Sequence, residues 1–367
     1  MPIQSLQITQ FRNVLSATIE CSPRFNLFYG DNGAGKTSML EAIYYLSLSK
    51  SFRTSHIDRL IYDNRENFVV FSRLLHNNVS IPIGIQRSRH AGSIVHINEE
   101  TIRSTAEVSR YLPIQFIGSD SHRILTDGPK TRRQFLDWGL FYTKPDFFIL
   151  WKRFQKTLDH KNAALKARAP KDEIIIWNQQ FTQLAESLHT MRQDYINAFL
   201  PFFNQIIAAL LGTNQIQLCY SPGWDTSDSL LFCLEKNIFR EIQIGHTLFG
   251  PHRADLMVTC EQTAAQDVLS QGQQKLVSYA LRLAQGLHFQ TATNEFPIYL
   301  IDDLPSELDS QKRNLVTSIL NKIDAQVFIT GIERADFEEI LASDCQNRMF
   351  HVKHGVVSAC LKAECFT

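Results

Sequence analysis

The chain contains 367 residues, of which 37 are basic and 37 acidic, and hydrophobic residues make up 44%. This length allows two or three domains with their own cores, and the balanced charge excludes a generally basic chain, so any contact with a polyanion requires a local basic patch. Seven scattered cysteines without a Cys-x-x-Cys pair argue against a disulfide framework and a zinc site, and they indicate a reducing compartment: Cys21, Cys219, Cys233, Cys260, Cys345, Cys360 and Cys365.

The first eight residues alternate between apolar and polar side chains, which predicts a β-strand rather than a signal peptide. No apolar stretch approaches the ~20 residues that a membrane-spanning helix needs. We therefore expect a soluble, cytoplasmic protein without a membrane partner.

A glycine-rich loop lies between a predicted strand and a predicted helix. The strand covers residues 25–29, and the helix places Leu40, Ile43 and Tyr44 at helical spacing. A glycine turn that binds nothing is the weaker interpretation, because strand, loop and helix together are the context that a phosphate-binding loop requires. The complete loop reads Gly30-Asp31-Asn32-Gly33-Ala34-Gly35-Lys36-Thr37.

The residue types of this loop indicate its ligand. The glycines let backbone N–H groups close around the α- and β-phosphates, and the helix N-terminus adds partial positive charge. Lys36 can reach the β- and γ-phosphates, where it also serves catalysis, and the Thr37 hydroxyl can ligate Mg²⁺. The sequence therefore predicts a binding site for a nucleoside triphosphate, with ATP and Mg²⁺ as its ligands.

The region that follows is predicted to contain strands near residues 68–73, 79–86 and 93–97 and then two long helices. The helices cover residues 147–169 and about 177–211, with a turn at 169–172. Basic side chains near the phosphate loop and on the first long helix are candidates for contacts with DNA phosphates, although a run of charges is more often a solvated helix face. They are Lys50, Arg53 and Arg59, and then Lys152, Arg153, Lys156, Lys161, Lys166 and Arg168.

A second helix start, Ser270-Gln271-Gly272-Gln273, allows two interpretations. Ser270 and Gln273 have the spacing of a helix-capping box, which explains every residue of the segment except Gly272. A hydroxyl, a glycine and a helix N-terminus also suit a γ-phosphate. The residues alone leave both interpretations open.

The apolar segment 297–301 ends in two carboxylates, Asp302 and Asp303. Beside a phosphate loop, Asp302 at the end of a strand is placed to hold Mg²⁺. Asp303 is then placed to orient or deprotonate the attacking water, as the catalytic carboxylate. A strand that merely ends in an aspartate-rich turn is the weaker interpretation once the phosphate loop is accepted.

The order of these segments resembles the ABC ATPase superfamily, and residues 306–309 match its loop for communication between subunits. The resemblance implies an ATP-dependent homodimer in which the phosphate loop and carboxylates of one subunit face Ser270–Gln273 of the other. More than two hundred residues separate Thr37 from Ser270, which is too many for a transporter ATPase and too few for the coiled coil of an SMC protein. We predict an α/β fold: an ABC-type head of two lobes, residues 1–140 and 245–367, with an inserted helical arm, residues 141–244.

Longer segments resemble the bacterial RecF family nearly end to end and in the same order. The resemblance implies a protein of DNA replication, DNA repair and the SOS response that binds double-stranded DNA without sequence preference and cooperates with RecR and RecO. It further implies that Arg53 lies near nucleotide and DNA, and that Gln115 lies near Mg²⁺. The matching segments are residues 6–13, 50–54, 127–137, 249–256 and 267–286.

Two positions depart from the wider ABC pattern. Asp303 stands where most of these ATPases have glutamate, and Thr330 ends a strand where they have histidine, although RecF-like proteins share both departures. Because positioning of the attacking water is a geometric requirement, we expect slow, DNA-stimulated hydrolysis that acts as a switch. The alternative is an ATP-switched scaffold with negligible hydrolysis, and an antiphage ATPase–nuclease is less favoured.

Four further polar residues belong to the segments that resemble the RecF family. Arg132 and Arg133 are expected to form structural ion pairs with Asp127 or Asp137. For His252 and Arg253 a role at the nucleotide and a structural role are both open.

Overall fold

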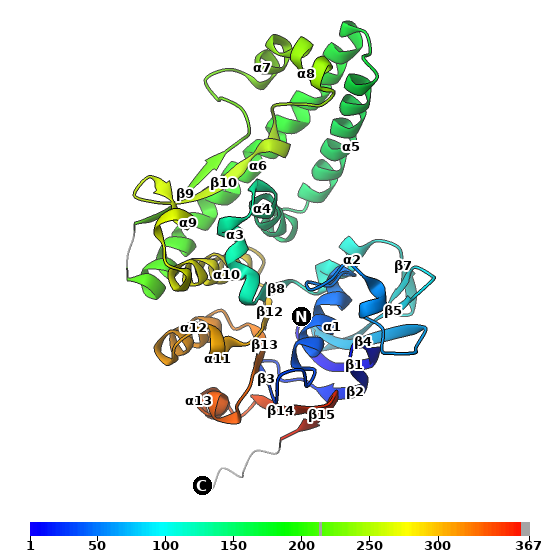
Figure 1. The fold of residues 1–367 in the computed structure, drawn as a ribbon, viewed down its shortest axis with the longest axis vertical. Coiled ribbons are helices and arrows are strands. Elements are labelled where there is room, and N and C mark those ends of the chain that lie inside the picture. Colours follow the sequence, from blue (N-terminus) through cyan, green and yellow to red (C-terminus); the bar gives the residue numbers. More distant parts are fainter. Residues whose placement is uncertain (213–214, 361–367) are drawn as a thin grey trace. The chain divides into compact units, whose positions relative to one another are not determined.

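The structure is a computed structural model that describes residues 1–212 and 215–360, so Cys365 lies outside the described residues. The chain forms two compact units (Figure 1). Unit 1 combines Met1–Ser121 with the segment from Phe289 onward, and unit 2 is His122–His288. The division at residues 140 and 244 into segments of different function remains a prediction.

Unit 1 is built on two six-stranded sheets. The first has the order β15-β14-β3-β13-β12-β8 and is parallel except for β15. Its strands are β3 (Phe25–Tyr29), β8 (Ile114–Ile117), β12 (Ile298–Ile301), β13 (Gln326–Gly331), β14 (Arg348–Lys353) and β15 (Val356–Ala359). Both ends of the chain therefore contribute neighbouring strands.

The second sheet is antiparallel, with the order β2-β1-β4-β5-β6-β7. It contains the predicted strands of the region 68–97, each with nearly the expected bounds. Its strands are β1 (Ile3–Phe11), β2 (Val14–Glu20), β4 (Asn67–His76), β5 (Val79–Ser88), β6 (Ser93–Ile97) and β7 (Glu100–Ile102).

Helix α1 (Lys36–Leu48) is the centre of the unit 1 core. Met39 and Ile43 of this helix belong to one apolar cluster together with Phe28 of the first sheet and Leu6 of the second. Because both sheets contribute to the cluster that surrounds it, α1 is buried along most of its length and lacks a wide polar face. The other helices of unit 1 are α2 (Thr105–Tyr111), α11 (Leu304–Glu307), α12 (Ser310–Lys322) and α13 (Glu338–Ser343), with short 3₁₀ turns at η1 (Ile57–Arg59) and η4 (Arg334–Phe337).

Unit 2 is dominated by α5 (Phe147–Lys166) and α6 (Lys171–Leu211), which pack side by side (Figure 1). A three-stranded sheet, β11-β10-β9, completes it. Its other elements are α3 (Arg123–Thr126), α4 (Pro129–Thr143), β9 (Ile216–Ser221), α7 (Leu230–Lys236), α8 (Ile238–Ile244), η3 (Pro251–Arg253), β10 (Asp255–Cys260), β11 (Thr263–Ala264) and α9 (Ala265–Val268). Two elements cross the boundaries between the units: η2 (Ser119–His122) and α10 (Gln271–Thr293).

Helix α6 begins earlier than the sequence predicts. The expected start was near residue 177, but the helix begins at Lys171, directly after Pro170. Proline is well tolerated at a helix start, and Asp172 and Glu173 in the first turn interact favourably with the helix dipole. The apolar pattern alone missed this turn because its first three residues are charged.

By length and composition, α6 is also apolar enough to cross a membrane, contrary to the expectation that no such stretch exists. This is weak support for a membrane role, since a core helix of a soluble protein passes the same test. Buried positions recur along its length, among them Ile174, Phe181 and Leu188.

Candidate nucleotide-binding site

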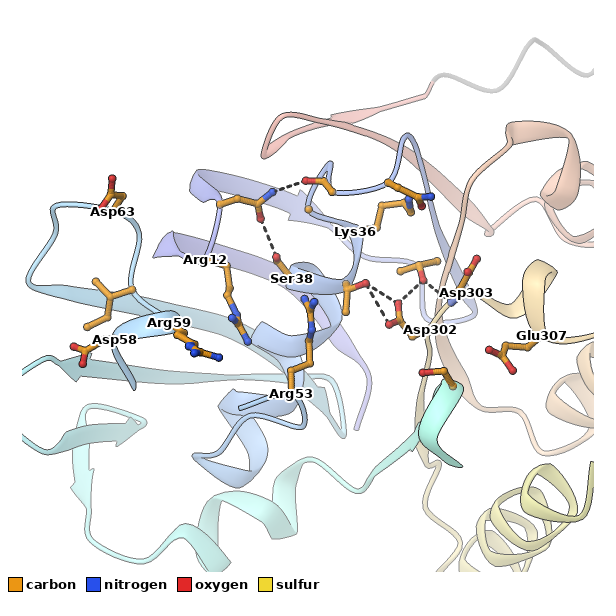
Figure 2. A pocket seen from close by; sticks show the side chains of 18 of the residues that line it. Arg12, Lys36, Ser38, Arg53, Asp58, Arg59, Asp63, Asp302, Asp303 and Glu307 are labelled. Carbon is orange, nitrogen blue, oxygen red and sulfur yellow. Dashed lines mark hydrogen bonds between the residues drawn. The ribbon is translucent and has the colours of Figure 1, made fainter. Parts of the chain in front are cut away.

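A cavity of about 730 Å³ in unit 1 brings together residues from both ends of the chain. The phosphate loop and α1 supply Lys36 and Thr37, the segment after β12 supplies Asp302 and Asp303, and the end of β13 supplies Thr330. Figure 2 shows how Lys36, Asp302 and Asp303 lie in this cavity. They meet because β3, β13 and β12 are adjacent parallel strands, so their carboxyl ends lie at one edge of the sheet.

The phosphate loop depends on glycine at defined positions. Gly30, Gly33 and Gly35 have φ angles of 148°, 77° and 116°, a region that other residues rarely adopt. A Cβ atom at Gly30 would also overlap the backbone carbonyl of Val352. The loop conformation therefore follows from the glycines, which leave its backbone free to surround an anion.

Lys36 lies inside this loop. Its Nζ donates hydrogen bonds to the backbone oxygens of Gly30 (2.6 Å) and Asp31 (3.0 Å). Burial lowers the pKa of Lys36, an effect that the nearby Asp303 and Asp302 oppose. The ammonium group is thus held at the loop, where a phosphate oxygen can replace the carbonyl partners.

Asp302 accepts hydrogen bonds from two threonines. Thr37 Oγ1 donates to Asp302 Oδ1 at 2.9 Å, and Thr330 Oγ1 donates to the same oxygen at 2.7 Å. Burial raises the pKa of Asp302, and the two hydroxyl groups act against that effect. The carboxylate is therefore close to the Thr37 hydroxyl, as a shared Mg²⁺ ion would require.

The residues of this pair fit Mg²⁺ chemically. The described part of the chain has no cluster of three His, Cys, Asp or Glu side chains able to hold a metal. Mg²⁺ bound with a nucleotide does not need one, because one or two protein oxygens complete a shell of phosphate oxygens and water. Thr37 and Asp302 provide that number of ligands.

Asp303 is held in an unusual backbone conformation beside Asp302. Its φ of 57° lies in the left-handed region, and its backbone N–H donates to Thr330 Oγ1 at 2.8 Å. Its Oδ1 atom is buried and accepts no hydrogen bond from the protein. Thr330, which the sequence marked only as a missing histidine, thus links both carboxylate residues.

Asn13 braces the phosphate loop, and no sequence motif pointed to this role. Its Nδ2 donates to the carbonyl of Gly33 at 3.1 Å, and its Oδ1 accepts from Ser38 Oγ at 2.8 Å. The backbone N–H of Gly355, between β14 and β15, donates to the carbonyl of Ala34 at 2.8 Å. Segments from both chain ends therefore fix the loop from outside.

Arg12 and Glu41 form a second support that the sequence did not reveal. The Arg12 guanidinium donates to both carboxylate oxygens of Glu41, at 2.8 and 2.6 Å, and Glu41 is fully buried. Ser51 Oγ also donates to Glu41, and it accepts from the backbone N–H of Arg53 at 2.8 Å. One buried carboxylate of α1 therefore positions both Arg12 and the turn that carries Arg53.

Replacing Glu41 with glutamine is expected to lower the free energy of unfolding by roughly 3 kcal/mol, because the Arg12 guanidinium would lose the buried carboxylate with which it pairs. Urea unfolding measures this loss. The double variant Arg12→Met/Glu41→Leu should recover part of it, since no charge is then left unpaired. A loss for Glu41→Gln below about 0.5 kcal/mol, the range of ordinary surface substitutions, would contradict this account.

The basic residues predicted near the phosphate loop do not all lie together. Arg53 and Arg59 line the nucleotide cavity, and Figure 2 shows both in it, whereas Lys50 is exposed and does not line it. Gln115 is also away from the cavity wall: it is fully buried in β8, opposite Tyr299 rather than at the strand end. Of the segment around β8, Ser119, two residues beyond the strand, lines the cavity.

The segment Ser270–Gln273 belongs to unit 2 and has the predicted capping box. The backbone N–H of Ser270 donates to Gln273 Oε1 at 3.0 Å, and the N–H of Gln273 donates to Ser270 Oγ at 3.3 Å. Gln271 is exposed, and a Cβ atom at the exposed Gly272 would meet nothing within 4 Å. Packing within the chain therefore does not explain this glycine.

The basic residues of α5 differ in their surroundings. Lys152, Arg153 and Lys156 are exposed, and Lys152 Nζ lies 4.3 Å from the centre of the Phe148 ring. Lys161 is instead fully buried and pairs with Glu241 at 3.0 Å, so it is not available to an external phosphate.

Comparison with known proteins shows the family and the fold. The family model described as RecF/RecN/SMC N-terminal domain matches residues 2–358. The DNA replication and repair protein RecF of Coxiella burnetii (strain Dugway 5J108-111) is 45% identical over 357 residues, which are 97% of this chain and 99% of that protein. RecF of Vibrio cholerae (strain El Tor Inaba N16961) is 39% identical over 362 residues, 97% of this chain and 99% of that protein.

Solved structures agree with the fold. A structure of the recombination mediator protein RecF with ATP, in the RecFOR pathway, has a TM-score of 0.85 and 23% identity, and it covers 98% of both chains. An Smc head domain with an extended coiled coil from Pyrococcus furiosus has a TM-score of 0.60 and 15% identity, covering 98% of this chain and 96% of that one. These likenesses confirm the predicted α/β ABC-type ATPase head with an inserted helical arm.

Proposed function

This chain belongs to the RecF family of DNA replication and repair proteins, and from that premise we propose that it is an ATP-dependent DNA-binding protein of recombinational repair and replication restart. One observation supports the ATP part above all others. Lys36, Thr37, Asp302 and Asp303 come from distant parts of the chain yet line one cavity with a glycine loop. That combination suits the phosphates of ATP better than any other ligand class.

Each residue of the cavity has a proposed task. The N–H groups of residues 30–37 and the Lys36 ammonium bind the phosphates, and Thr37 with Asp302 holds Mg²⁺. When bound, Mg²⁺ neutralises charge on the β- and γ-phosphates. Asp303 orients the attacking water through its unpartnered buried oxygen.

We further propose an ATP-dependent homodimer. Ser270–Gln273 is exposed at the start of α10, and Gly272 has open space around it, so another molecule can approach closely. In the dimer, this segment of one subunit would contact the γ-phosphate bound to its partner. ATP then favours the closed dimer, and hydrolysis lets it open.

DNA binding through phosphates, without base readout, is the expected consequence of closure. Exposed Lys152, Arg153 and Lys156 on α5 and the exposed Lys50 are candidates for these contacts. Arg53 and Arg59 line the nucleotide cavity, so they are better placed to contact ATP. Cooperation with RecR and RecO, at gapped DNA in the cytoplasm, follows from family membership and remains part of the proposal.

The test combines sizing by light scattering with binding of a short duplex, each with and without ATP. We expect ATP both to convert monomer to dimer and to tighten DNA binding, because ligands that favour one state are reciprocally coupled. If the protein remains monomeric with ATP and binds DNA equally well without it, the proposed ATP-dependent homodimer is ruled out.

A second function, an ATP-switched scaffold with negligible hydrolysis, is favoured by one observation. Asp303 has a shorter side chain than the glutamate of most ABC ATPases, so its carboxylate reaches less far toward a water molecule. In this case ATP would still drive dimerisation, but the rate of ATP loss would not depend on Asp303.

A further inference from the structure

Two of the segments that resemble the RecF family, residues 127–137 and 249–256, meet within unit 2. Arg132 on α4 donates to both oxygens of Asp255 at the start of β10, at 2.7 and 3.0 Å. Its neighbour Arg133 donates to the backbone carbonyl of Ala254 at 2.8 Å. The expected partners of Arg132, Asp127 and Asp137, are therefore wrong as ion pairs, although Arg132 does donate to the backbone oxygen of Asp127.

Arg192 of α6 joins the same place. It donates to Asp137 Oδ1 at 2.8 Å and to the carbonyl of Pro251 at 2.8 Å, and its side chain is only 3% exposed. Asp137 and Asp255 are thus each engaged by one arginine. We call Arg132, Arg133, Arg192 and Arg253 the arginine node.

Two members of the arginine node lack a carboxylate partner. Among the described residues, neither Arg133 nor Arg253 has an acidic group within ion-pair distance; their hydrogen bonds go to the backbone oxygens of Ala254 and Thr247. Burial lowers the pKa of Arg133 and the charge of Arg192 lowers it further, while the charges of Asp137 and Asp255 oppose the shift. The four arginines of the node face these two carboxylates, so the node keeps an excess of two positive charges.

The neighbouring His252 reflects the same excess of charge. Its ring accepts or donates one hydrogen bond, with the carbonyl of Thr247 at 3.0 Å. Burial lowers its pKa to about 4, and the charges of Arg253 and Arg133 contribute to the shift. Excess positive charge that is partly shielded from water is unfavourable, so the arginine node is suited to bind an anion that is not part of this chain.

We propose that Arg133 and Arg253 bind a phosphate of the duplex DNA backbone. This inference rests on the proposed function and names one contact of its DNA surface. A planar guanidinium offers paired N–H groups that match phosphate oxygens, and two of them can share one phosphate. Arg253 is exposed and Arg133 half-buried, so DNA can reach the first, while the hydrogen bond to the Ala254 carbonyl orients the second.

This arrangement differs from the basic residues of α5. Lys152, Arg153 and Lys156 are exposed and can keep their hydration, so they gain little from a particular anion. The arginine node is held in place by charged hydrogen bonds between elements. Arg132 joins α4 to Asp255 of β10, and Arg192 joins α6 to Asp137 of α4. For Arg253, the sequence allows a role at the nucleotide or a structural role, and the excess positive charge of the node favours a third role, contact with DNA.

The test measures the salt dependence of duplex binding, in the presence of ATPγS, for Arg253→Gln, Arg253→Lys and Arg240→Gln. Arg240 is an exposed arginine of α8 outside the node and serves as the matched control. Loss of one phosphate contact should reduce the slope of log K against log salt by about 1 and weaken binding roughly five- to tenfold near 0.1 M salt. Of these three variants, Arg253→Gln is expected to show the smaller slope and the weaker binding. Arg253→Lys keeps a positive charge and should keep the slope, and Arg240→Gln should leave it unchanged.

Arg133→Gln probes the same site from α4 and should give the same change of slope. If both glutamine variants match Arg240→Gln within twofold at every salt concentration, while the unmodified chain binds DNA, the phosphate site is excluded. Binding of no DNA at all by the unmodified chain would instead remove the proposed function together with this site. Thermal unfolding of each variant shows whether a loss of DNA binding reflects misfolding. If a glutamine variant is destabilised, Arg253→Lys decides: retained slope supports the phosphate contact, and a reduced slope contradicts it.

Discussion

Replacing Lys36 with methionine is expected to reduce ATP affinity by about a hundredfold or more. Removing one partner of a close, partly buried charge pair costs about 3 kcal/mol, which corresponds to that factor. Methionine has a similar length and keeps the apolar part of the side chain, so the fold should persist. The carbonyls of Gly30 and Asp31 lose their hydrogen bonds from Nζ in this variant.

Calorimetric titration with ATP measures this loss, and the same variant should lose ATP-dependent dimerisation and the tightening of DNA binding. Lys50→Met is the matched control for ATP affinity alone, because Lys50 is exposed beyond the end of α1 and does not line the cavity. ATP affinity within threefold of the unmodified chain for Lys36→Met would show that the glycine loop is not the phosphate site.

Replacing Asp303 with asparagine is expected to reduce ATP hydrolysis by a factor of about one hundred or more while leaving ATP-dependent dimerisation intact. A positioned base contributes roughly this much to proton transfer. Asparagine has the same shape and also tolerates the left-handed backbone that Asp303 adopts at φ 57°. Its backbone N–H can keep the hydrogen bond to Thr330, so the change is confined to the carboxylate.

Single-turnover decay of ATP separates the two proposed functions. Asp159→Asn is a matched acid-to-amide control, because Asp159 is an exposed residue of α5 in unit 2 and does not line the nucleotide cavity. An unchanged slow rate in Asp303→Asn would favour the scaffold over the switch that consumes ATP.

The parts of the site that the sequence predicted are those encoded by local patterns. The strand, loop and helix around Lys36 occupy consecutive residues, so their types and spacing identify them. Asp302 was found in the same way, as a carboxylate at the end of an apolar strand. Their meeting at one cavity follows from parallel strand order, which the ABC resemblance implied.

The parts that the sequence missed depend on contacts between distant residues. Asn13 and Arg12 sit in a turn between β1 and β2, and nothing in that turn indicates that it touches the phosphate loop or Glu41. Gln115 was misplaced for a related reason. An apolar segment predicts that a strand is present, but it does not predict where the strand ends or its register. Gln115 pairs with Tyr299 inside β8 and is therefore buried two residues before the strand end.

The order of the strands in unit 1 also affects how the chain can fold during synthesis. β3, which leads into the phosphate loop, lies between β13 and β14 in its sheet, and these two strands begin at Gln326 and Arg348. All residues of unit 2 are therefore synthesised before either strand that pairs with β3. Because the nucleotide cavity needs these late strands, an incomplete copy released by a stalled ribosome would be unable to bind ATP and so could not enter a dimer with complete copies.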